Sequence, residues 1–334
     1  MKFKELEFFT AITNIIKKYH NGRDIILIGY YPRFADFLTE NGLTIRKTYR
    51  LSEGKKNVSP LRFIKNDKLK AEDCYILFTE TPRKTSYCLR MAEWGFDQFK
   101  DYVFANHGKI TLPAHSPDYE DEYGNKVHGG GCKVFLNDTA CNVTIEVDDT
   151  TTFDDKCFIS VRHAIGASIQ IGGGCKFVDN ASVVAVGDAS ISIGRKNTIV
   201  SNASVVAFAG NTITIGDDCL ISYDVRIYSG DGHAFYDSVT QERLNPPIHQ
   251  PKNIISIGNH VWIGMRVVII NRCQIGDGCI IGGCALVKGT YPNNCTIGGN
   301  PAKLLRKNVS WAHNHTESTF EDCPPAYTHA TEES

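Results

Sequence analysis

The hydrophobic positions of residues 257–299 repeat with a period of six. The repeating aliphatic residues are Ile257, Ile263, Ile269, Ile275, Ile281 and Val287. The residue four places after each of the first five is small or β-branched: Val261, Val267, Cys273, Cys279 and Ala285. A helix face repeats at about 3.6 residues and a strand face at about 2, so neither element produces this period. Six residues with two inward positions instead predict a short strand followed by a corner.

Three such units make one triangular coil of about 18 residues, and coils of this kind stack into a parallel β-helix. A single coil cannot bury its inner face, so the stacking of neighbours supplies the core. A longer repeat extends the pattern toward the N-terminus, with Ile171, Ile193 and Ile215 spaced 22 residues apart and VDNASVVA recurring as VSNASVVA. That spacing is one coil plus a short corner loop. We therefore predict a β-helix over residues 132–301.

The period lapses between Ile227 and Ile257. The intervening stretch is polar and proline-rich, too long for a corner and too polar for a strand. Long loops on a rigid scaffold are often functional. We therefore predict a protruding loop over residues 228–254 and look for the chemistry there.

The N-terminal half alternates between apolar runs and helical patterns. The predicted helices are 3–20, 32–42 and 82–95, and the predicted strands are 24–30, 43–50, 74–80 and 101–106. This alternation predicts a small open parallel sheet, Rossmann-like in outline. A dinucleotide site would need G-x-G-x-x-G after the first strand, but Gly29 stands alone. We therefore favour a structural, oligomerising or acceptor-positioning role for this half.

The domain organisation follows from these patterns. The predicted parts are a Rossmann-like α/β accessory domain at 1–110, a polar linker at 111–131, the β-helix at 132–301, and a short basic helix with a loose tail at 302–334. The fold class is thus mainly β, with a small α/β domain in front.

Composition narrows the function classes. With 36 basic and 37 acidic residues the chain has no nucleic-acid footprint. No apolar run approaches the roughly 18 residues of a membrane span, and the N-terminus lacks the pattern of a secretory signal. Of the 12 cysteines, five (Cys157, Cys175, Cys219, Cys273 and Cys279) fall at the small fifth place of a hexapeptide, and no C-x-x-C occurs. We expect reduced, buried thiols in a cytoplasmic protein, with no metal site.

The hexapeptides, the loop SGDGHAFYD, the coil IGNHVWIG and the later GGNPAK together resemble the hexapeptide-repeat acyltransferases. The likeness is nearest to bacterial capsule or surface-polysaccharide sugar O-acetyltransferases. It covers about 170 residues of the C-terminal half. The resemblance implies a left-handed β-helix, a homotrimer, and acetyl-CoA lying between adjacent β-helices.

The family base is a histidine in the loop before the W-I-G coil, and His233 stands at that place. An imidazole with a pKa near neutrality suits removal of a proton from a sugar hydroxyl. His249 in the same loop is the alternative base. His163 and His260 lie inside hexapeptides, and we expect both to face outward. Glu242 is the predicted orienting partner of His233, with Asp231 or a backbone carbonyl as alternatives.

The resemblance also assigns binding residues. Asp224 falls where family members carry an asparagine that faces the acceptor, and Trp262 matches a tryptophan that packs on the acceptor or the pantetheine arm. An outward tryptophan needs a cover, from a ligand or a neighbouring subunit. The further residues implied for CoA are Gly264, Met265, Gly282, Gly283 and Lys288, with Lys303 and Arg306 facing the phosphates.

These inferences favour an acetyl-CoA-dependent O-acetyltransferase that acts on a sugar hydroxyl of a surface polysaccharide or its precursor, by direct transfer. Three alternatives stay open. One is an N-acetyltransferase of a nucleotide-linked amino sugar, against which the broken glycine fingerprint argues. Another is a metal-dependent hydratase, which lacks the expected H-x₄-H spacing. The last is a non-catalytic β-helix used for assembly.

Overall fold

The computed structural model of the chain divides into two compact units. One consists of Met1–Ile110, Glu120–Asn125 and Asn137–Asn142, and the other of Thr111–Tyr119, Lys126–Leu136 and Val143–Ser334. The structure describes residues 3–29, 32–49, 61–79, 90–91, 93–96, 100, 102–104, 110–114, 118–121, 123–129, 131–137, 140–162, 164, 166–208, 210–231, 233–245, 254–313 and 319–328.

The N-terminal unit contains the predicted small parallel sheet. Its four strands lie in the order β2-β1-β3-β4, and each adjacent pair is parallel. The strands are β1 (Asp24–Ile28), β2 (Ile45–Tyr49), β3 (Cys74–Phe78) and β4 (Tyr102–Phe104), and the helices are α1 (Phe3–Tyr19), α2 (Pro32–Glu40) and α3 (Leu61–Asn66). We did not predict α3. Most of the predicted helix 82–95 lies outside the described residues.

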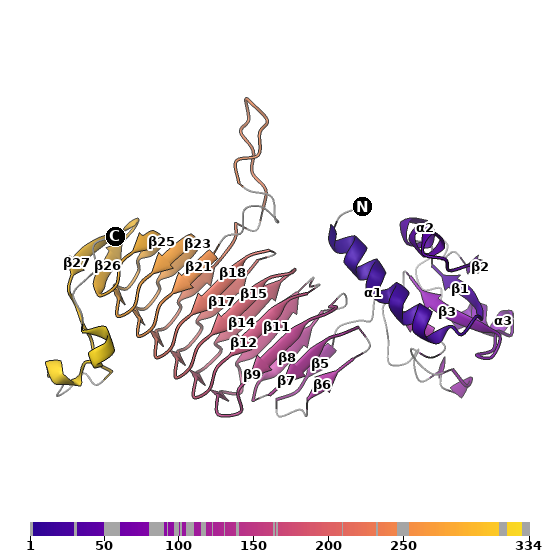
Figure 1. The fold of residues 1–334 in the computed structure, drawn as a ribbon, viewed down its shortest axis with the longest axis horizontal. Helices are drawn as coiled ribbons and strands as arrows, with labels where there is room; N and C mark the ends of the chain where they lie inside the picture. The colour runs from indigo at the N-terminus through magenta and orange to yellow at the C-terminus, as the bar shows by residue number, and fades with distance from the viewer. Residues whose placement is uncertain are drawn as a thin grey trace. The chain divides into compact units, whose positions relative to one another are not determined.

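The C-terminal unit is a left-handed parallel β-helix, as expected (Figure 1). Two sheets form its faces. The shorter sheet runs through β10 (Thr152–Phe153), β13 (Lys176–Phe177), β16 (Thr198–Ile199), β19 (Leu220–Ile221), β22 (Trp262–Ile263), β24 (Ile280–Ile281), β26 (Cys295–Gly299) and β27 (Ala302–Lys307). Every neighbouring pair is parallel except the last, β26 with β27.

The longer sheet covers the other two faces. One face runs through β5 (Ile110–Leu112), β8 (Lys133–Leu136), β11 (Phe158–Arg162), β14 (Ser182–Val186), β17 (Ser204–Ala207), β20 (Arg226–Tyr228) and β23 (Val268–Ile275). The other returns through β21 (Ile254–Ile257), β18 (Thr212–Ile215), β15 (Ser190–Ile193), β12 (Ser168–Ile171), β9 (Thr144–Val147), β7 (Lys126–His128) and β6 (Tyr119–Glu120), while β25 (Leu286–Tyr291) pairs with β23. The long strand β23 thus joins both faces.

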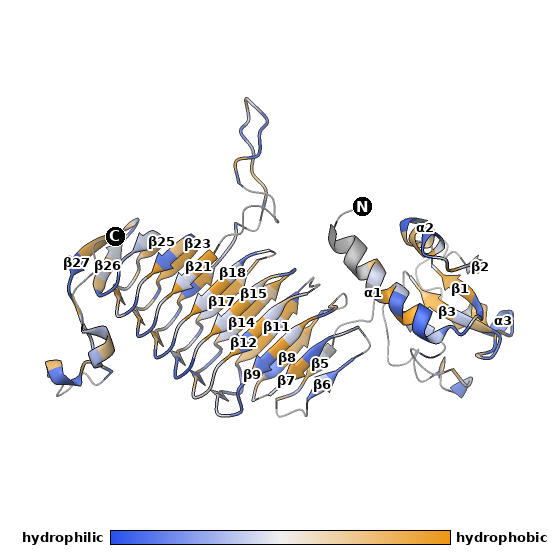
Figure 2. Ribbon diagram, in the orientation of Figure 1, coloured by the Kyte–Doolittle hydropathy of each residue, from blue (hydrophilic) through white to orange (hydrophobic). Residues whose placement is uncertain are grey.

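The strand register reproduces the sequence repeats. Ile169 lies opposite Ile191, 22 residues later, and Trp262 lies opposite Ile280, 18 residues later. The interior is filled by the aliphatic first places and the small fifth places of the hexapeptides, and Figure 2 shows the resulting hydrophobic strands. None of the 11 cysteines that the structure describes forms a disulfide with another of them, and all but Cys284 are buried. The expected role of these thiols as apolar filler is confirmed.

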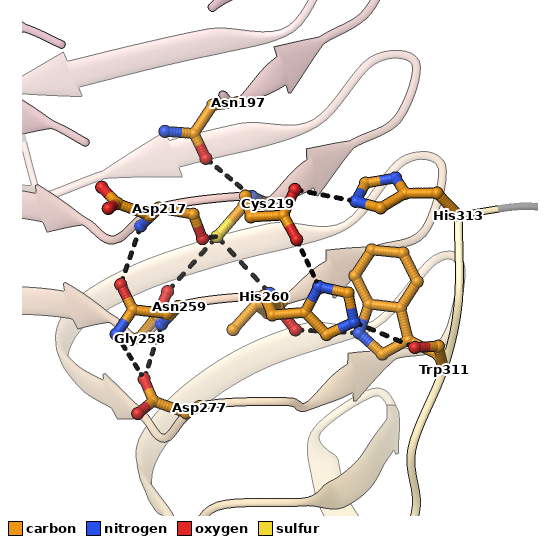
Figure 3. Close-up of polar contacts among 11 residues, drawn as sticks. Asn197, Asp217, Cys219, Gly258, Asn259, His260, Asp277, Trp311 and His313 are labelled. Atoms are coloured by element: carbon orange, nitrogen blue, oxygen red, sulfur yellow. Dashed lines mark hydrogen bonds and ion pairs between the residues drawn. The ribbon is translucent and has the colours of Figure 1, made fainter. Parts of the chain in front are cut away.

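The corners are held by a ladder of polar side chains that runs from coil to coil. The amide N–H of Asp217 donates to Asn259 Oδ1 at 2.8 Å, and that of Asn259 donates to Asp277 Oδ1 at 2.6 Å (Figure 3). Glycine precedes each of these residues because the coils approach closely there. A Cβ on Gly258 would lie 2.4 Å from Asp277 Oδ1. The second and third places of the hexapeptide are therefore set by stacking, not by the interior.

Two predicted segments differ from the structure. The basic stretch at 302–307 is not a helix but the strand β27, which pairs antiparallel with β26 at the end of the β-helix. An open sheet edge offers hydrogen bonds that outweigh the helical tendency of a Leu-Leu-Arg-Lys sequence. The stretch at 111–131 is not simply a linker, because part of β5 and all of β6 and β7 lie within it and belong to the longer sheet. Among the described helices, none has the length and apolar character that crossing a membrane requires.

Candidate functional site

The predicted loop emerges between β20 and β21 and forms a hairpin of residues 231–245, which projects from the coils (Figure 1). Tyr236 and Arg243 form an antiparallel bridge, and the Asp237 N–H donates to the Glu242 carbonyl at 2.8 Å. At the tip, the Asp237 carboxylate accepts the N–H groups of Thr240 and Val239 at 2.7 and 2.8 Å. These backbone hydrogen bonds lower the pKa of Asp237 below its ordinary value.

The base of the hairpin is fixed by Asn245, which is buried. Its side-chain N–H groups donate to the His233 carbonyl at 2.7 Å and to Asp231 at 3.2 Å. Its Oδ1 accepts the Phe235 N–H at 3.1 Å. Asn271 on β23 donates to the other oxygen of Asp231. The backbone around His233 is therefore anchored to the coils.

His233 itself is exposed. Within the described residues its imidazole has no hydrogen-bond partner, so only the backbone of His233 is anchored. The predicted partner Glu242 is also exposed, and among the described residues no hydrogen bond or ion pair joins its carboxylate to His233. Asp231 is engaged by the two asparagines instead. The orienting role of Glu242 stays a prediction, and His249 lies outside the described residues, as does His163.

A second group of predicted residues lies along the corner that follows the shorter sheet. Met265 is half exposed, and its carbonyl accepts the Cys284 N–H at 2.9 Å. A Cβ on Gly283 would lie 3.2 Å from the same carbonyl, and one on Gly264 would lie 2.8 Å from Gly283 N. Trp262, on the adjacent strand β22, is 41% exposed. Its outward position is as expected.

The corner continues toward the C-terminal strand. The Gly282 N–H donates to Ile297 O at 2.8 Å, and in the next position Gly298 pairs with Lys303 of β27. Lys303 and Arg306 are exposed. Most of the predicted CoA residues thus form one continuous edge. Lys288 is the exception, since it lies on β25, in the other sheet.

One residue at this corner escaped the sequence analysis. Tyr223 is half exposed, and its carbonyl accepts the Arg266 N–H at 2.9 Å. It therefore occupies the corner of the coil before Met265. Tyr223 is the third residue of the hexapeptide that starts at Ile221, and this position in the sequence could have indicated that it lies at a corner. The neighbouring Asp224 lies 3.9 Å from the Arg266 guanidinium, so its carboxylate faces a cation as well as any acceptor.

His260 corrects our expectation of an outward surface histidine. It stands at the left-handed fourth place of its hexapeptide, with φ 52°, yet it is completely buried. The cause is the C-terminal segment, whose Trp311 covers it with ring centroids 4.0 Å apart (Figure 3). One signal in the sequence could have indicated this contact, namely a single tryptophan in the segment that follows the β-helix.

The only cluster of possible metal ligands among the described residues is Asp218, His260 and His313, whose ligand atoms lie within 4.8 Å of one another. Both nitrogens of His260 are already engaged. Nδ1 lies 2.8 Å from Asp218 and Nε2 lies 2.9 Å from the Trp311 carbonyl. The other oxygen of Asp218 lies 3.1 Å from His313 Nε2. A cation at this cluster would have to displace these contacts of Asp218.

Comparisons with known proteins agree with this fold. Residues 255–289 match the family described as bacterial transferase hexapeptide (six repeats). The polysialic acid O-acetyltransferase of Escherichia coli O1:K1 is 35% identical over 31% of this chain and 33% of its own length. The galactoside O-acetyltransferase of Escherichia coli K12 is 34% identical over 25% of this chain and 45% of its own length. The chain therefore spans less than half of each of these relatives.

Among solved structures, the polySia specific acetyltransferase NeuO matches 60% of this chain and 83% of its own, with a TM-score of 0.52 and 28% identity. The shared coils, the shared hexapeptides and this superposition define one class of protein. The chain contains bacterial-transferase hexapeptide repeats at residues 255–289 within a β-helix of the left-handed type. Its relatives include the polysialic acid O-acetyltransferase described above. They also include a protein of Escherichia coli K12 that bears the name putative lipopolysaccharide biosynthesis O-acetyl transferase WbbJ.

Proposed function

We propose that this protein is an acetyl-CoA-dependent O-acetyltransferase that acts on a sugar hydroxyl of a bacterial surface polysaccharide or its precursor. The observation that carries the proposal is the setting of His233. Its imidazole is exposed, its backbone is anchored, and its hairpin lies between the repeats at 171–228 and the repeats at 254–299. The similarity to polysialic acid O-acetyltransferase supports the acceptor class.

In this mechanism His233 accepts the proton of the sugar hydroxyl while the hydroxyl oxygen attacks the thioester carbonyl carbon. The resulting tetrahedral intermediate collapses with cleavage of the carbon–sulfur bond, and the proton on His233 passes to the departing CoA thiolate. A general base of this kind contributes typically about 10²–10⁴-fold to the rate. An imidazole whose nitrogens are unengaged is available for both proton transfers.

The edge formed by Gly264, Met265 and Gly283 is the proposed track of the pantetheine arm. Gly283 is exposed and has no side chain to cover its backbone, and the exposed Trp262 offers a flat apolar surface on the strand before this corner. Lys303 and Arg306 are exposed cations near the end of this edge, where the CoA phosphates would find them.

We further propose a homotrimer with the sites between subunits. The hairpin carries exposed apolar side chains, including Phe235, Tyr236 and Leu244. In water such a hairpin is a liability, and the coils of a second copy would cover it. Heterologous contacts of this kind form a closed ring of three when the rotation between neighbours is one third of a turn. His233 of one subunit would then act on acetyl-CoA held along the edge of the next.

Mass spectrometry of glycans incubated with the full chain and acetyl-CoA tests the proposal. The panel should contain sialic acid oligomers, galactosides, lipopolysaccharide-derived oligosaccharides and a nucleotide-linked amino sugar. Gain of one acetyl group that hydroxylamine removes under mild conditions would support an O-acetyl ester. An acetyl group that survives this treatment on the amino sugar would overturn the proposal in favour of N-acetylation. Weak binding of acetyl-CoA, together with no transfer across the panel, would favour an assembly role.

A further inference from the structure

His260 lies in an aromatic stack built by the C-terminal segment. Its ring is parallel to Trp311, with centroids 4.0 Å apart and planes 8° apart. On the other side Tyr327 stacks at 5.0 Å and 9°. Burial raises the pKa of Tyr327, and the nearby carboxylates of Asp277 and Asp218 add to the effect. The proposed catalytic mechanism uses none of these residues.

Reciprocal hydrogen bonds connect His260 to Trp311. The Trp311 indole N–H donates to the His260 carbonyl at 2.8 Å, and the His260 Nε2–H donates to the Trp311 carbonyl at 2.9 Å (Figure 3). The opposite ring nitrogen of His260 faces Asp218 at 2.8 Å. These bonds fix Trp311 in position and in orientation, since stacking alone would allow the indole to slide.

Trp311 also contacts Trp262, with ring centroids 6.0 Å apart and planes at 43°. Trp262 is 41% exposed, whereas Trp311 is only 7% exposed. Trp311 therefore forms the inner support of an indole whose outer face is open. Without that support, an exposed tryptophan on a flat strand could adopt several rotamers.

We infer that His260 and Trp311 are positioning residues for the acetyl-transfer site, which hold the Trp262 indole in one orientation toward its ligand. The identity of the ligand that Trp262 binds rests on the proposed function. The contact between Trp262 and Trp311 is independent of it. An aromatic pair contributes about 0.5–1.5 kcal/mol beyond its buried area. Loss of the support should therefore raise one KM by roughly 3- to 10-fold and leave kcat nearly unchanged, as expected for ground-state binding.

The chain contains three tryptophans, and the third, Trp94, lies in the N-terminal unit. Coupling between two close indoles gives an exciton couplet in the far-ultraviolet circular dichroism spectrum. We expect the couplet in the wild-type protein, and we expect its loss in Trp262→Phe and Trp311→Phe but not in Trp94→Phe. In His260→Asn, which tolerates the left-handed backbone, the couplet should weaken because Trp311 is no longer held. An absent couplet, or one that persists in Trp311→Phe, would overturn the contact.

Kinetics test the positioning role separately. Trp262→Phe identifies which KM, for acetyl-CoA or for acceptor, depends on the indole, and Trp311→Leu should raise the same one. The double variant Trp262→Phe/Trp311→Leu should show less than the sum of both effects in free energy. Additive effects, or an unchanged KM in a folded Trp311→Leu protein, would overturn positioning but leave the proposed activity standing. Should Trp311→Leu fail to fold, Trp311→Phe and His260→Asn carry the same test.

A chelator experiment tests whether a cation bound to Asp218, His260 and His313 holds the stack. If the couplet of the wild-type protein is unchanged by EDTA, the hydrogen bonds of His260 suffice to hold Trp311. If EDTA abolishes the couplet and Zn²⁺ alone restores it, a cation and not the Asp218 contact holds the stack, and the inference about His260 is wrong. Failure of acetyl transfer to any glycan would refute the proposed function without affecting either spectroscopic result.

Discussion

The hairpin at 231–245 and the coils at 254–299 each carry one histidine, and they treat it in opposite ways. His260 of the coils is buried, stacked on two rings and bonded through both nitrogens. His233 of the hairpin is exposed, and only its backbone carbonyl is held. A histidine that must exchange protons needs a nitrogen without a permanent partner. The comparison therefore favours His233 over His260 as the base of the proposed reaction.

The largest effect should come from His233→Ala. Because the variant removes the proposed base, turnover should fall about 10²–10⁴-fold, which equals about 3–5 kcal/mol of barrier. The thermal midpoint should stay within the error of the wild-type value, since the side chain is exposed. Initial rates with acetyl-CoA and the best acceptor measure the first, and a thermal melt the second. Ser238→Ala in the same hairpin is the matched control, and near-normal turnover in His233→Ala would rule out the assigned base.

Substitution inside the coils should have the reverse signature. Ile263 is completely buried, so Ile263→Ala should lower the free energy of unfolding of the β-helix by about 2–5 kcal/mol. Val239 at the hairpin tip is 88% exposed, and Val239→Ala should change the free energy of unfolding by less than about 0.5 kcal/mol. Urea denaturation monitored by circular dichroism compares the two. Similar destabilisation by both would mean that the hairpin is a structural part of the coils.

High pH should weaken the coils and spare the hairpin. Burial raises the pKa of Cys132, Cys219 and Cys273 to about 12 each. A thiol whose folded pKa exceeds its unfolded value of about 8.5 keeps its full stabilising effect below pH 8.5 and loses it as the pH rises toward 12. Each of the three thiols should lower the free energy of unfolding by about 1.4 kcal/mol per pH unit in that window.

The slope of unfolding free energy against pH between 8.5 and 11 measures this effect. Cys219→Val should reduce the slope by the contribution of one thiol. The variant should still fold, because valine already occupies the equivalent place at Val261. Cys284→Ser should leave it unchanged, because that thiol is exposed. A slope that Cys219→Val does not alter would show that this thiol ionises equally in both states.

The smallest effect concerns the orientation of the base. If Glu242 orients His233 during turnover, Glu242→Gln should lower kcat about tenfold, the value of one charge-assisted hydrogen bond. Asp231→Asn provides the comparison, because Asp231 is already bonded to Asn245 and Asn271. A larger loss in Asp231→Asn than in Glu242→Gln would reverse our assignment of the partner.

The two regions also differ in how well the sequence predicted them. The coils followed from a period of six that many residues share, so single exceptions did not matter. The hairpin was predicted only as a break in that period, and its internal bonds depend on Asn245, which no pattern singled out. The strand β27 was mistaken for a helix because its pairing partner β26 lies at the end of a stack that the local sequence does not reveal.

By itself, the sequence determined the shape of each coil, the length of the repeat and the place of the interruption. These properties depend on residues close together in the chain, since each hexapeptide carries its own inward and corner positions. Only the tertiary structure decided that His260 is buried, that Trp311 supports Trp262 and that β27 continues the sheet. The first two outcomes join residues about 50 positions apart, and a histidine at a coil corner has the same local sequence whether water or a tryptophan covers it. The third depends on the sheet edge that β26 presents at the end of the stack.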